Sequence, residues 1–206
     1  MSANDPDSGF PPPDHRDRLR WEAKYGPGFV PSFTPRPFAI RALAMDLPDG
    51  PVADLACGPS GTALLAAAAG RQVTAVDISE LALGMLGAEA GRRGLEHLVT
   101  LVHGDLARWR PAPGSHALVL CTGWWERAVF GVAAAAVAPG GLLGWEALTA
   151  EARRARPGLP PDRCLGPDEP AALLPAGFTA ADQHDVPGHR GLMRRLLLAR
   201  RTPPRQ

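Results

Sequence analysis

The chain has 206 residues, of which 45% are apolar and 21% charged, and its formal net charge is +1. This length and apolar content suffice for one domain with a buried core. Lys24 is the only lysine, and the arginines are scattered without a dense run, which argues against a phosphate-neutralising face. We therefore expect a small-molecule ligand and no nucleic-acid partner.

Membrane and metal signals are missing from the sequence. No stretch reaches the ~20 apolar residues of a spanning helix, and the acidic N-terminus lacks the apolar centre of a signal peptide. Three cysteines form no CxxC pair and no Cys/His cluster with zinc spacing, and their odd number argues against a disulfide framework. We expect a cytoplasmic protein in a reducing compartment, with no membrane partner and no metal.

The first part of the chain is predicted to be a tail followed by a cover. Residues 1–14 are rich in Pro, Asp, Ser and Gly, a composition that predicts disorder. Residues 15–25 read as a short helix, and the glycines and prolines that follow predict a loop. Pro37 then starts a helix to about Met45. Residues 15–46 form the predicted N-terminal cover.

Apolar strands alternate with helical patterns from residue 51 onward. This alternation predicts a parallel sheet with helices on both faces, and Ser79 is the expected N-cap of its helix. The predicted strands are 52–57, 72–77, 98–103, 115–121 and 141–148, and the predicted helices are 60–69, 79–93 and 127–137.

The pattern changes after the fifth strand. Residues 153–161 are predicted as loop and 167–174 as a short helix, and two further strands follow at 177–186 and 191–201. Only Pro187-Gly188 and its neighbours join these strands, so they must form an antiparallel hairpin. The sequence thus predicts an α/β fold, a doubly wound Rossmann-like sheet in a single domain over 15–206, with its core sheet at 51–201.

One β-α-β unit carries most of the functional information. The apolar strand at 52–57 runs into a loop of small residues that ends at Gly61, and the next strand ends on Asp77, 16 residues after Gly61. Small side chains at Ala56, Gly58 and Gly61 let the backbone pass close under a ligand, and Asp77 can accept from both hydroxyls of a ribose. The spacing predicts a cofactor site for an adenosine-like ligand.

These motifs resemble a known family. The loop from Asp54 to Gly61, the strand-end Asp77, Gly104-Asp105-Leu106, and Pro139-Gly-Gly-Leu-Leu are similar to class I S-adenosylmethionine-dependent methyltransferases over residues 40–201. Trp21-Glu22-Ala-Lys24-Tyr25 and the segment at 165–178 look most like the small bacterial tellurite-resistance-type branch. The resemblance implies five parallel strands plus the C-terminal hairpin in the order 3-2-1-4-5-7-6.

The resemblance implies S-adenosylmethionine as cofactor and S-adenosylhomocysteine as product. Asp54 would meet the amino group, Asp77 the ribose diol and Ile78 the adenine face. Asp105 would accept from the adenine amine while the Leu106 amide donates to the ring. The predicted cofactor-binding residues are Asp54, Ala56, Cys57, Gly58, Gly61, Asp77, Ile78, Gly104, Asp105, Leu106, Cys121 and Thr122.

Some of these residues have simpler interpretations. Asp77 and Asp105 are also typical of strand ends and helix caps, and Cys57 and Cys121 read as small buried residues rather than nucleophiles. Ala56 stands where the family more often has its first glycine. This departure leaves open which residue of the loop lies closest to the methionine moiety.

The acceptor side is less defined. Trp124 and Trp125 leave the fourth strand, and either they line the cofactor pocket and the core or they form an apolar wall for a methyl acceptor. No catalytic residue is assigned. The weak candidates are Trp124, Glu126, Glu146 and Tyr25.

The predicted activity is methyl transfer by in-line displacement to an oxygen, nitrogen, sulfur or metalloid acceptor, in which proximity does much of the work and a base is optional. A non-catalytic S-adenosylmethionine-binding module and an NAD-dependent oxidoreductase are the alternatives. A nucleic-acid methyltransferase is disfavoured because the fourth strand ends in Cys-Thr-Gly-Trp rather than an Asp-Pro-Pro-Tyr type of motif. The acceptor, and whether the chain is a monomer or homodimer, stay open.

Overall fold

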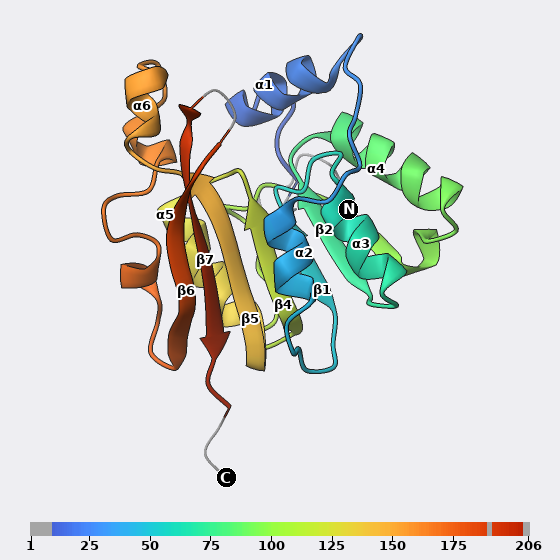
Figure 1. Cartoon of the computed structure of the whole chain (residues 1–206). Coiled ribbons are helices and arrows are strands. Elements are labelled where there is room, and N and C mark those ends of the chain that lie inside the picture. The colour runs from blue at the N-terminus through green and yellow to red at the C-terminus, as the bar shows by residue number, and fades with distance from the viewer. Residues whose placement is uncertain (1–9, 189–190, 204–206) are drawn as a thin grey trace. The chain divides into compact units, whose positions relative to one another are not determined.

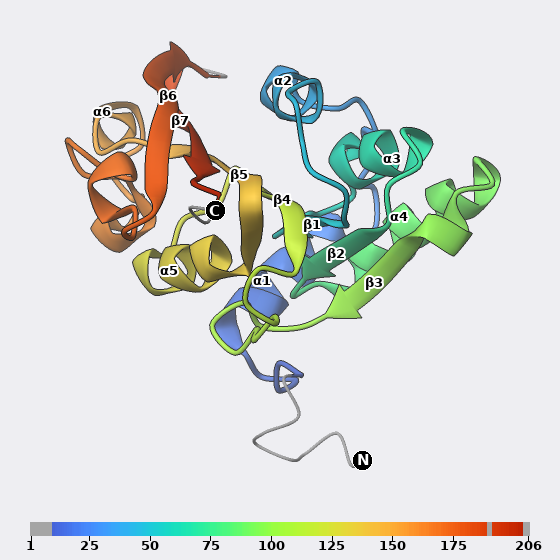
Figure 2. The same cartoon turned by 90° about the horizontal axis from the view of Figure 1, so that it is seen from below.

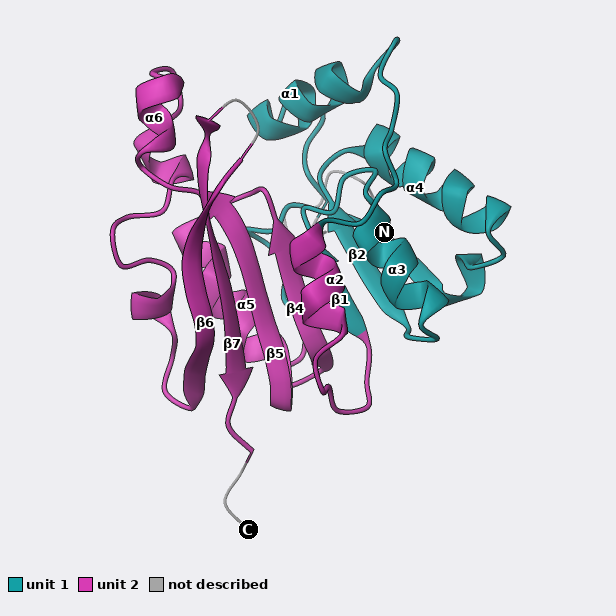
Figure 3. Ribbon diagram, viewed as in Figure 1, with its two compact units in different colours: residues 1–36, 52–110 teal, residues 37–51, 111–206 magenta. Residues whose placement is uncertain are grey.

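The computed structural model describes residues 10–188 and 191–203. Its strands follow the order β3-β2-β1-β4-β5-β7-β6, which confirms the predicted Rossmann-like sheet and its closing hairpin (Figure 1). Two compact units interleave in the sequence, residues 1–36 with 52–110 and residues 37–51 with 111–206 (Figure 3). The single domain over 15–206 stays a prediction, and residues 1–9 of the predicted tail lie outside the described residues.

Unit 1 contains the predicted β-α-β unit. Its β2 pairs in parallel with both β1 and β3, so that Val73 lies opposite Val52 on one side and Val99 on the other. Helix α3 packs on β1 and β2, α4 packs on β2 and β3, and α1 packs on α4. The elements are α1 (Arg16–Tyr25), β1 (Val52–Leu55), α3 (Gly61–Ala68), β2 (Val73–Asp77), α4 (Glu80–Arg92), the 3₁₀ turn η1 (Glu96–Leu98) and β3 (Val99–His103).

Local sequence explains where α4 begins. Ser79 has extended backbone angles, and its hydroxyl accepts a hydrogen bond from the Ala82 amide at 3.2 Å. The hydroxyl thereby satisfies one of the amides that a first helical turn leaves without a partner, so the predicted N-cap is confirmed. Glu22 of α1 adds a second cap, since its carboxylate accepts from the Glu80 amide at 2.7 Å.

Unit 2 contains the rest of the sheet. Here β4 and β5 run parallel, while β7 is antiparallel to both β5 and β6, as predicted for a hairpin. The elements are α2 (Pro37–Leu43), β4 (His116–Thr122), α5 (Arg127–Ala136), β5 (Val137–Leu148), α6 (Ala152–Ala155), the 3₁₀ turns η2 (Pro161–Arg163) and η3 (Ala171–Leu173), β6 (Phe178–Pro187) and β7 (Met193–Arg201).

Helices cover both faces of β4 and β5 (Figure 2). A Cβ on Gly144 would lie 3.4 Å from the Phe38 ring of α2. The next residue, Trp145, points to the other face, where its ring packs against Phe130 of α5 at 5.3 Å between centroids. Neighbouring residues of a strand face opposite sides, so the missing side chain at Gly144 makes room for α2 while Trp145 fills the α5 face.

Several predicted boundaries differ from those in the structure. The fifth strand begins at Val137 rather than 141, because the pairing shifts between His116 and Leu118 and the extra residues bulge around Gly140. The expected loop at 153–161 begins with the single helical turn α6, which ends before Pro157. The expected helix over 167–174 is only the turn η3, since prolines at both ends leave no room for α-helical hydrogen bonds.

No helix in the described part of the chain is both long enough and apolar enough to cross a membrane.

Candidate active site

The loop between β1 and α3 has an unusual backbone. Ala56 has φ +48° and Gly58 has φ +56°, so both lie in the left-handed region. Glycine enters this region freely, whereas alanine pays for its Cβ. Ala56 therefore adopts the backbone of the glycine that more often stands at this position in the resembled family. The strand ends at Leu55, two residues earlier than expected, and the Cys57 amide donates to the Val76 carbonyl at 3.1 Å.

Asp77 ties this loop to the end of β2. Its carboxylate accepts from the Gly58 amide at 2.7 Å and from the Ser79 amide at 2.9 Å, and the side chain is buried. Burial raises the pKa of Asp77, and the amides of Ser79, Gly58 and Ile78 partly offset that effect. Each carboxylate oxygen keeps a lone pair for a further donor, so this arrangement can still accept from a hydroxyl pair.

Asp54 is fully buried at the end of β1, and neither of its oxygens has a hydrogen-bond partner among the described residues. Burial is the main cause that raises the pKa of Asp54 to about 7, and the charge of Asp77 adds to it. The nearby Ala63 amide and Arg36 act in the opposite direction. Buried carboxylates are costly unless they are compensated, and the weak compensation from the Ala63 amide and Arg36 leaves room for a further donor or cation at Asp54.

Two hydroxyls share this property. Ser60, the N-cap residue of α3, and Thr62 in its first turn both have buried hydroxyl oxygens without a partner in the described chain. The sequence offered a signal for them that was not used, namely two polar side chains in the first turn of an otherwise apolar helix. The Asp54 carboxylate can accept hydrogen bonds, and the two hydroxyls can both donate and accept them, so the loop between β1 and α3 has unused polar groups of both kinds.

The predicted adenine end lies between β2 and β3. Gly104 donates its amide to the Asp77 carbonyl at 3.0 Å, and Leu106 is buried. Asp105 accepts from the Ala107 amide at 2.9 Å and lies 3.7 Å from His15. The arrangement leaves Asp105 partly exposed at the end of β3, where it can accept from an amine.

Two histidines border this end of the candidate site. His103 lies 3.1 Å from the Ile78 carbonyl and 3.3 Å from Glu80, and Phe10 packs edge-on against its ring. His15 contacts Asp105. No spacing in the sequence predicts these contacts, because the partners come from separate elements.

Helix α1 and the following loop cover the β1–α3 loop. Tyr25 is buried and stacks on Trp21 at 5.6 Å, and a Cβ on Gly58 would lie 3.0 Å from the Tyr25 hydroxyl. Burial, with the charges of Asp77 and Cys57, raises the pKa of Tyr25. The phenol therefore stays protonated at neutral pH, which fits a hydrogen-bond donor and not a base.

Gly61 is needed for a different reason from the one expected. A Cβ at this position would lie 2.1 Å from the Phe33 carbonyl oxygen and 2.7 Å from the Pro35 nitrogen. The N-terminal cover thus approaches the start of α3 so closely that only glycine fits. The close approach is made by the chain itself, whereas the sequence had indicated a ligand.

The predicted residues of unit 2 lie around the end of β4. Cys121 is fully buried and Thr122 half-buried, and the Gly123 amide donates to the Glu146 carbonyl at 2.7 Å. Glu146 is buried and paired with Arg194 at 2.7 Å, a partner that the sequence did not reveal. Glu146 therefore belongs to a structural ion pair, and its carboxylate is already bound to Arg194.

The two adjacent tryptophans have different surroundings. Trp125 is buried and packs against Phe130 and Trp145 at 5.7 and 5.8 Å between ring centroids. Trp124 is half-buried, and the Arg163 guanidinium lies 5.8 Å from its ring centroid. One indole thus belongs to the core of unit 2, and the other carries a cation on its face.

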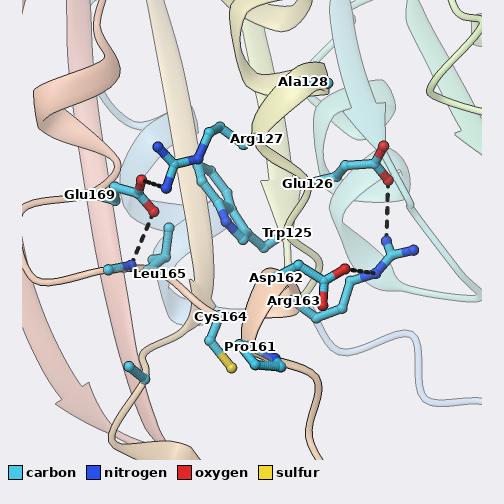
Figure 4. A pocket seen from close by; sticks show the side chains of 12 residues that line it. Trp125, Glu126, Arg127, Ala128, Pro161, Asp162, Arg163, Cys164, Leu165 and Glu169 are labelled. Atoms are coloured by element: carbon cyan, nitrogen blue, oxygen red, sulfur yellow. Dashed lines mark hydrogen bonds and ion pairs between the residues drawn. The ribbon is translucent and has the colours of Figure 1, made fainter.

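A cavity of about 490 Å³ opens in unit 2 beside these residues (Figure 4). Glu126, the N-cap residue of α5, lines it and pairs with Arg163 at 3.2 Å. The cavity is lined by Trp125, Glu126, Arg127, Ala128, Ala150, Pro161, Asp162, Arg163, Cys164, Leu165, Gly166 and Glu169.

Metal and thiol chemistry find no support in the described residues. No cluster of three or more histidine, cysteine, aspartate or glutamate side chains is placed to hold a metal ion there. The cysteines are buried and form no disulfide, and burial raises the pKa of the Cys164 thiol above its usual value. A buried neutral thiol is a poor nucleophile.

The fold and the loop geometry define a Rossmann-like α/β protein, with a candidate cofactor site at the ends of β1 and β2. Residues 52–141 match the family model of a methyltransferase domain. These residues run from β1 into β5 and include every predicted cofactor contact. A search of curated protein sequences finds no match.

Solved structures with this fold include methyltransferases. Magnesium protoporphyrin IX methyltransferase from Synechocystis PCC 6803, with S-adenosylhomocysteine bound, is 20% identical and aligns over 89% of this chain and 94% of that one at TM-score 0.65. The 1,6-didemethyltoxoflavin-N1-methyltransferase of Burkholderia thailandensis, with 1,6-didemethyltoxoflavin and S-adenosylhomocysteine bound, is 21% identical over 81% and 77% at TM-score 0.62.

A third similar structure is the cyclase SpnF, which is 18% identical over 81% of this chain and 79% of that one at TM-score 0.64. At such identities the likeness concerns the fold. The match to a methyltransferase domain over residues 52–141 adds a likeness of sequence to this likeness of fold. The tellurite-resistance-type branch stays a prediction.

Proposed function

We propose that this chain binds S-adenosylmethionine at the loop between β1 and α3 and transfers its methyl group to a small-molecule acceptor. Asp54 receives the amino group of the methionine moiety, and Asp77 accepts from the ribose diol. Ile78 packs on the adenine, with Asp105 accepting from its amine and the Leu106 amide donating to its ring.

The observation that carries the proposal is the buried, partnerless carboxylate of Asp54. An ammonium group placed against it would supply the missing donor and cation in one contact. A pyrophosphate at the same loop would meet this carboxylate and Asp77 as like charges. The charge of the site thus favours a cofactor that carries an amino acid over NAD, which shares the glycine loop but brings a pyrophosphate.

Other residues would line the cofactor without a charged contact. Ala56, Cys57, Gly58 and Gly61 form the loop, and the unpartnered Ser60 and Thr62 hydroxyls can donate to a carboxylate there. Gly104 completes the proposed set within unit 1, and the cofactor contacts expected of Cys121 and Thr122, which lie in unit 2, stay predictions. Gly58 contributes its left-handed backbone conformation rather than a hydrogen bond to the cofactor, because its amide already donates to Asp77.

When bound, the cofactor supplies an electrophilic methyl group on a sulfonium. The bond from the acceptor atom to this methyl carbon would replace the carbon–sulfur bond, with the electron pair left on sulfur and the acceptor proton lost to solvent. The chain's task is to hold the two partners in line and exclude water, which can lower the barrier by ~7–11 kcal/mol. Glu126 and Glu146 are ion-paired and Tyr25 stays protonated, so no base is assigned.

Calorimetric titration with S-adenosylhomocysteine and with NAD tests the cofactor. We expect S-adenosylhomocysteine to bind and Asp54→Asn to weaken it about 10- to 100-fold, the value of a lost charge-assisted contact. Asp49→Asn, an exposed carboxylate in the loop before β1, is the matched control and should bind as the parent does. Binding of NAD alone would contradict the proposal.

Transfer itself is tested by S-adenosylhomocysteine formation with thiol, phenol, amine and tellurite acceptors. Product with any acceptor supports transfer, and methylation of tellurite would support the tellurite-resistance-type branch. Tight cofactor binding without product would favour the non-catalytic module, an outcome that the fold of SpnF makes worth testing, because a methyltransferase-like fold there belongs to a cyclase.

A further inference from the structure

The cavity in unit 2 lies where the chain leaves two parallel strands. Trp125 and Glu126 follow the end of β4, and Ala150 follows the end of β5. In open α/β sheets, ligands bind outside the carboxyl ends of the strands. The cavity volume of about 490 Å³ lies within the range of small-molecule sites.

One end of the cavity has a fixed carboxylate. Glu169 is only 7% exposed, and it accepts from the Gly166 amide at 3.0 Å. Arg195 fixes the loop from Gly166 to Glu169 by donating to the carbonyls of both residues, at 3.0 Å each. The cation paired with Glu169 is Arg127, whose side chain is 67% exposed. The carboxylate therefore stays in place, while its cation can swing into solvent at little cost.

The other end has a fixed cation. The Arg163 side chain is 27% exposed and lies against the face of Trp124. Glu126 pairs with it at 3.2 Å, whereas Asp162, 78% exposed, reaches it only at 4.0 Å. Asp162 is the weakly held partner, so a ligand carboxylate can take its place on the guanidinium.

Figure 4 shows these two ends on opposite sides of Trp125, with Leu165 beside Glu169. We infer that the cavity binds a small zwitterion, whose ammonium group pairs with Glu169 and whose carboxylate pairs with Arg163, with an apolar segment between them. This binding does not rest on the proposed function, because every residue that lines the cavity belongs to unit 2.

Three related probes test the inference by calorimetry on the full chain. They are 4-(aminomethyl)benzoate, which carries both charges, benzylamine, which lacks the carboxylate, and benzoate, which lacks the amine. We expect the zwitterion to bind at least about tenfold more tightly than either one-ended compound, since each charged contact is worth about a factor of ten. Equal affinity for all three, or no binding at millimolar concentration, would overturn the inference.

Variants assign the two ends. Glu169→Gln still accepts from the Gly166 amide, and it should remove the advantage of the zwitterion over benzoate. Arg163→Met keeps the side-chain length, and it should remove the advantage over benzylamine. Arg127→Ala should tighten binding of both amines a few-fold, because it frees Glu169, whereas a purely structural ion pair predicts no gain.

Asp162→Asn removes the carboxylate that competes for Arg163, so it should tighten binding of the zwitterion and of benzoate a few-fold and leave benzylamine unchanged. Circular dichroism checks that each variant folds. Titration with S-adenosylhomocysteine separates the two proposals: failure of that cofactor to bind, with the probe preference intact, would contradict the proposed function and leave the zwitterion site in place. If Glu169→Gln and Arg163→Met bind all three probes as the parent chain does, the assignment of Glu169 and Arg163 is refuted.

Discussion

Replacing Asp54 by asparagine should stabilise the ligand-free protein and weaken its cofactor site at the same time. Burial raises the pKa of Asp54 from 3.8 to about 7, so the folded chain holds this proton more tightly than the unfolded chain does. Between these two values the folded state carries the extra proton, and its stability falls as pH rises through this window. Above pH 7 the full penalty of the buried charge is present.

The size of the effect follows from the pKa values. A rise of about 3 pKa units at 1.36 kcal/mol each corresponds to about 4 kcal/mol at high pH, of which roughly 2–3 kcal/mol develops between pH 5 and pH 8. The asparagine amide is also buried without a partner, at ~1–3 kcal/mol, but this cost does not depend on pH. For a chain of this size, the melting-temperature difference between the variants should grow by roughly 5–10 °C from pH 5 to pH 8.

Thermal melts of the parent chain and Asp54→Asn across pH 5–8 measure this growth, with Asp49→Asn as the control for removing a carboxylate. Saturating S-adenosylhomocysteine should flatten the difference, because its ammonium group compensates the charge of Asp54 in the parent chain. A difference between parent and Asp54→Asn that stays constant with pH would refute the reasoning, since Asp54 would then have an ordinary pKa.

Other substitutions test the loop and its supports. Ala56→Gly should be neutral or stabilise by up to about 1 kcal/mol, because it relieves a positive φ while loosening the unfolded chain, and Ala56→Val should destabilise by at least ~1 kcal/mol in denaturant titrations. Gly61→Ala should destabilise the fold by ~2 kcal/mol or more and weaken cofactor binding, since its Cβ would lie 2.1 Å from the Phe33 carbonyl oxygen. Gly84→Ala, on the open surface of a helix, should instead stabilise the fold by ~0.5–1 kcal/mol. Glu146→Ala should cost ~3–5 kcal/mol by urea unfolding, because it leaves Arg194 without its ion-pair partner, and a loss under ~1 kcal/mol would show that solvent compensates this arginine.

The arrangement of the sheet was within reach of the sequence. Apolar strands alternate with helical patterns, and a parallel crossover needs a helix-length connection whereas Pro187-Gly188 does not allow one. Ser79 marks the start of its helix through a side chain that acts within one turn. Such features depend on neighbouring residues, so the chain reveals them before it folds.

The element ends were harder to predict because distant pairing sets them. The shift between His116 and Leu118 decides where β5 begins, and no residue near Val137 records it. Gly61 was singled out from the sequence as a residue of the cofactor loop, but the contact that excludes a side chain there comes from Phe33, some thirty residues earlier in the chain.

The candidate site residues were proposed from the sequence, whereas their burial and their hydrogen-bond partners came only from the tertiary structure. The order of Asp54, Asp77 and Asp105 along the chain predicted an adenosine-type cofactor, because strand ends in a parallel sheet meet at one edge. Only the tertiary structure decided that Asp54 is buried without a partner, that Asp77 already accepts two amides, and that Glu146 is paired. Burial and partner choice arise when remote segments pack together, and a linear spacing holds no record of either.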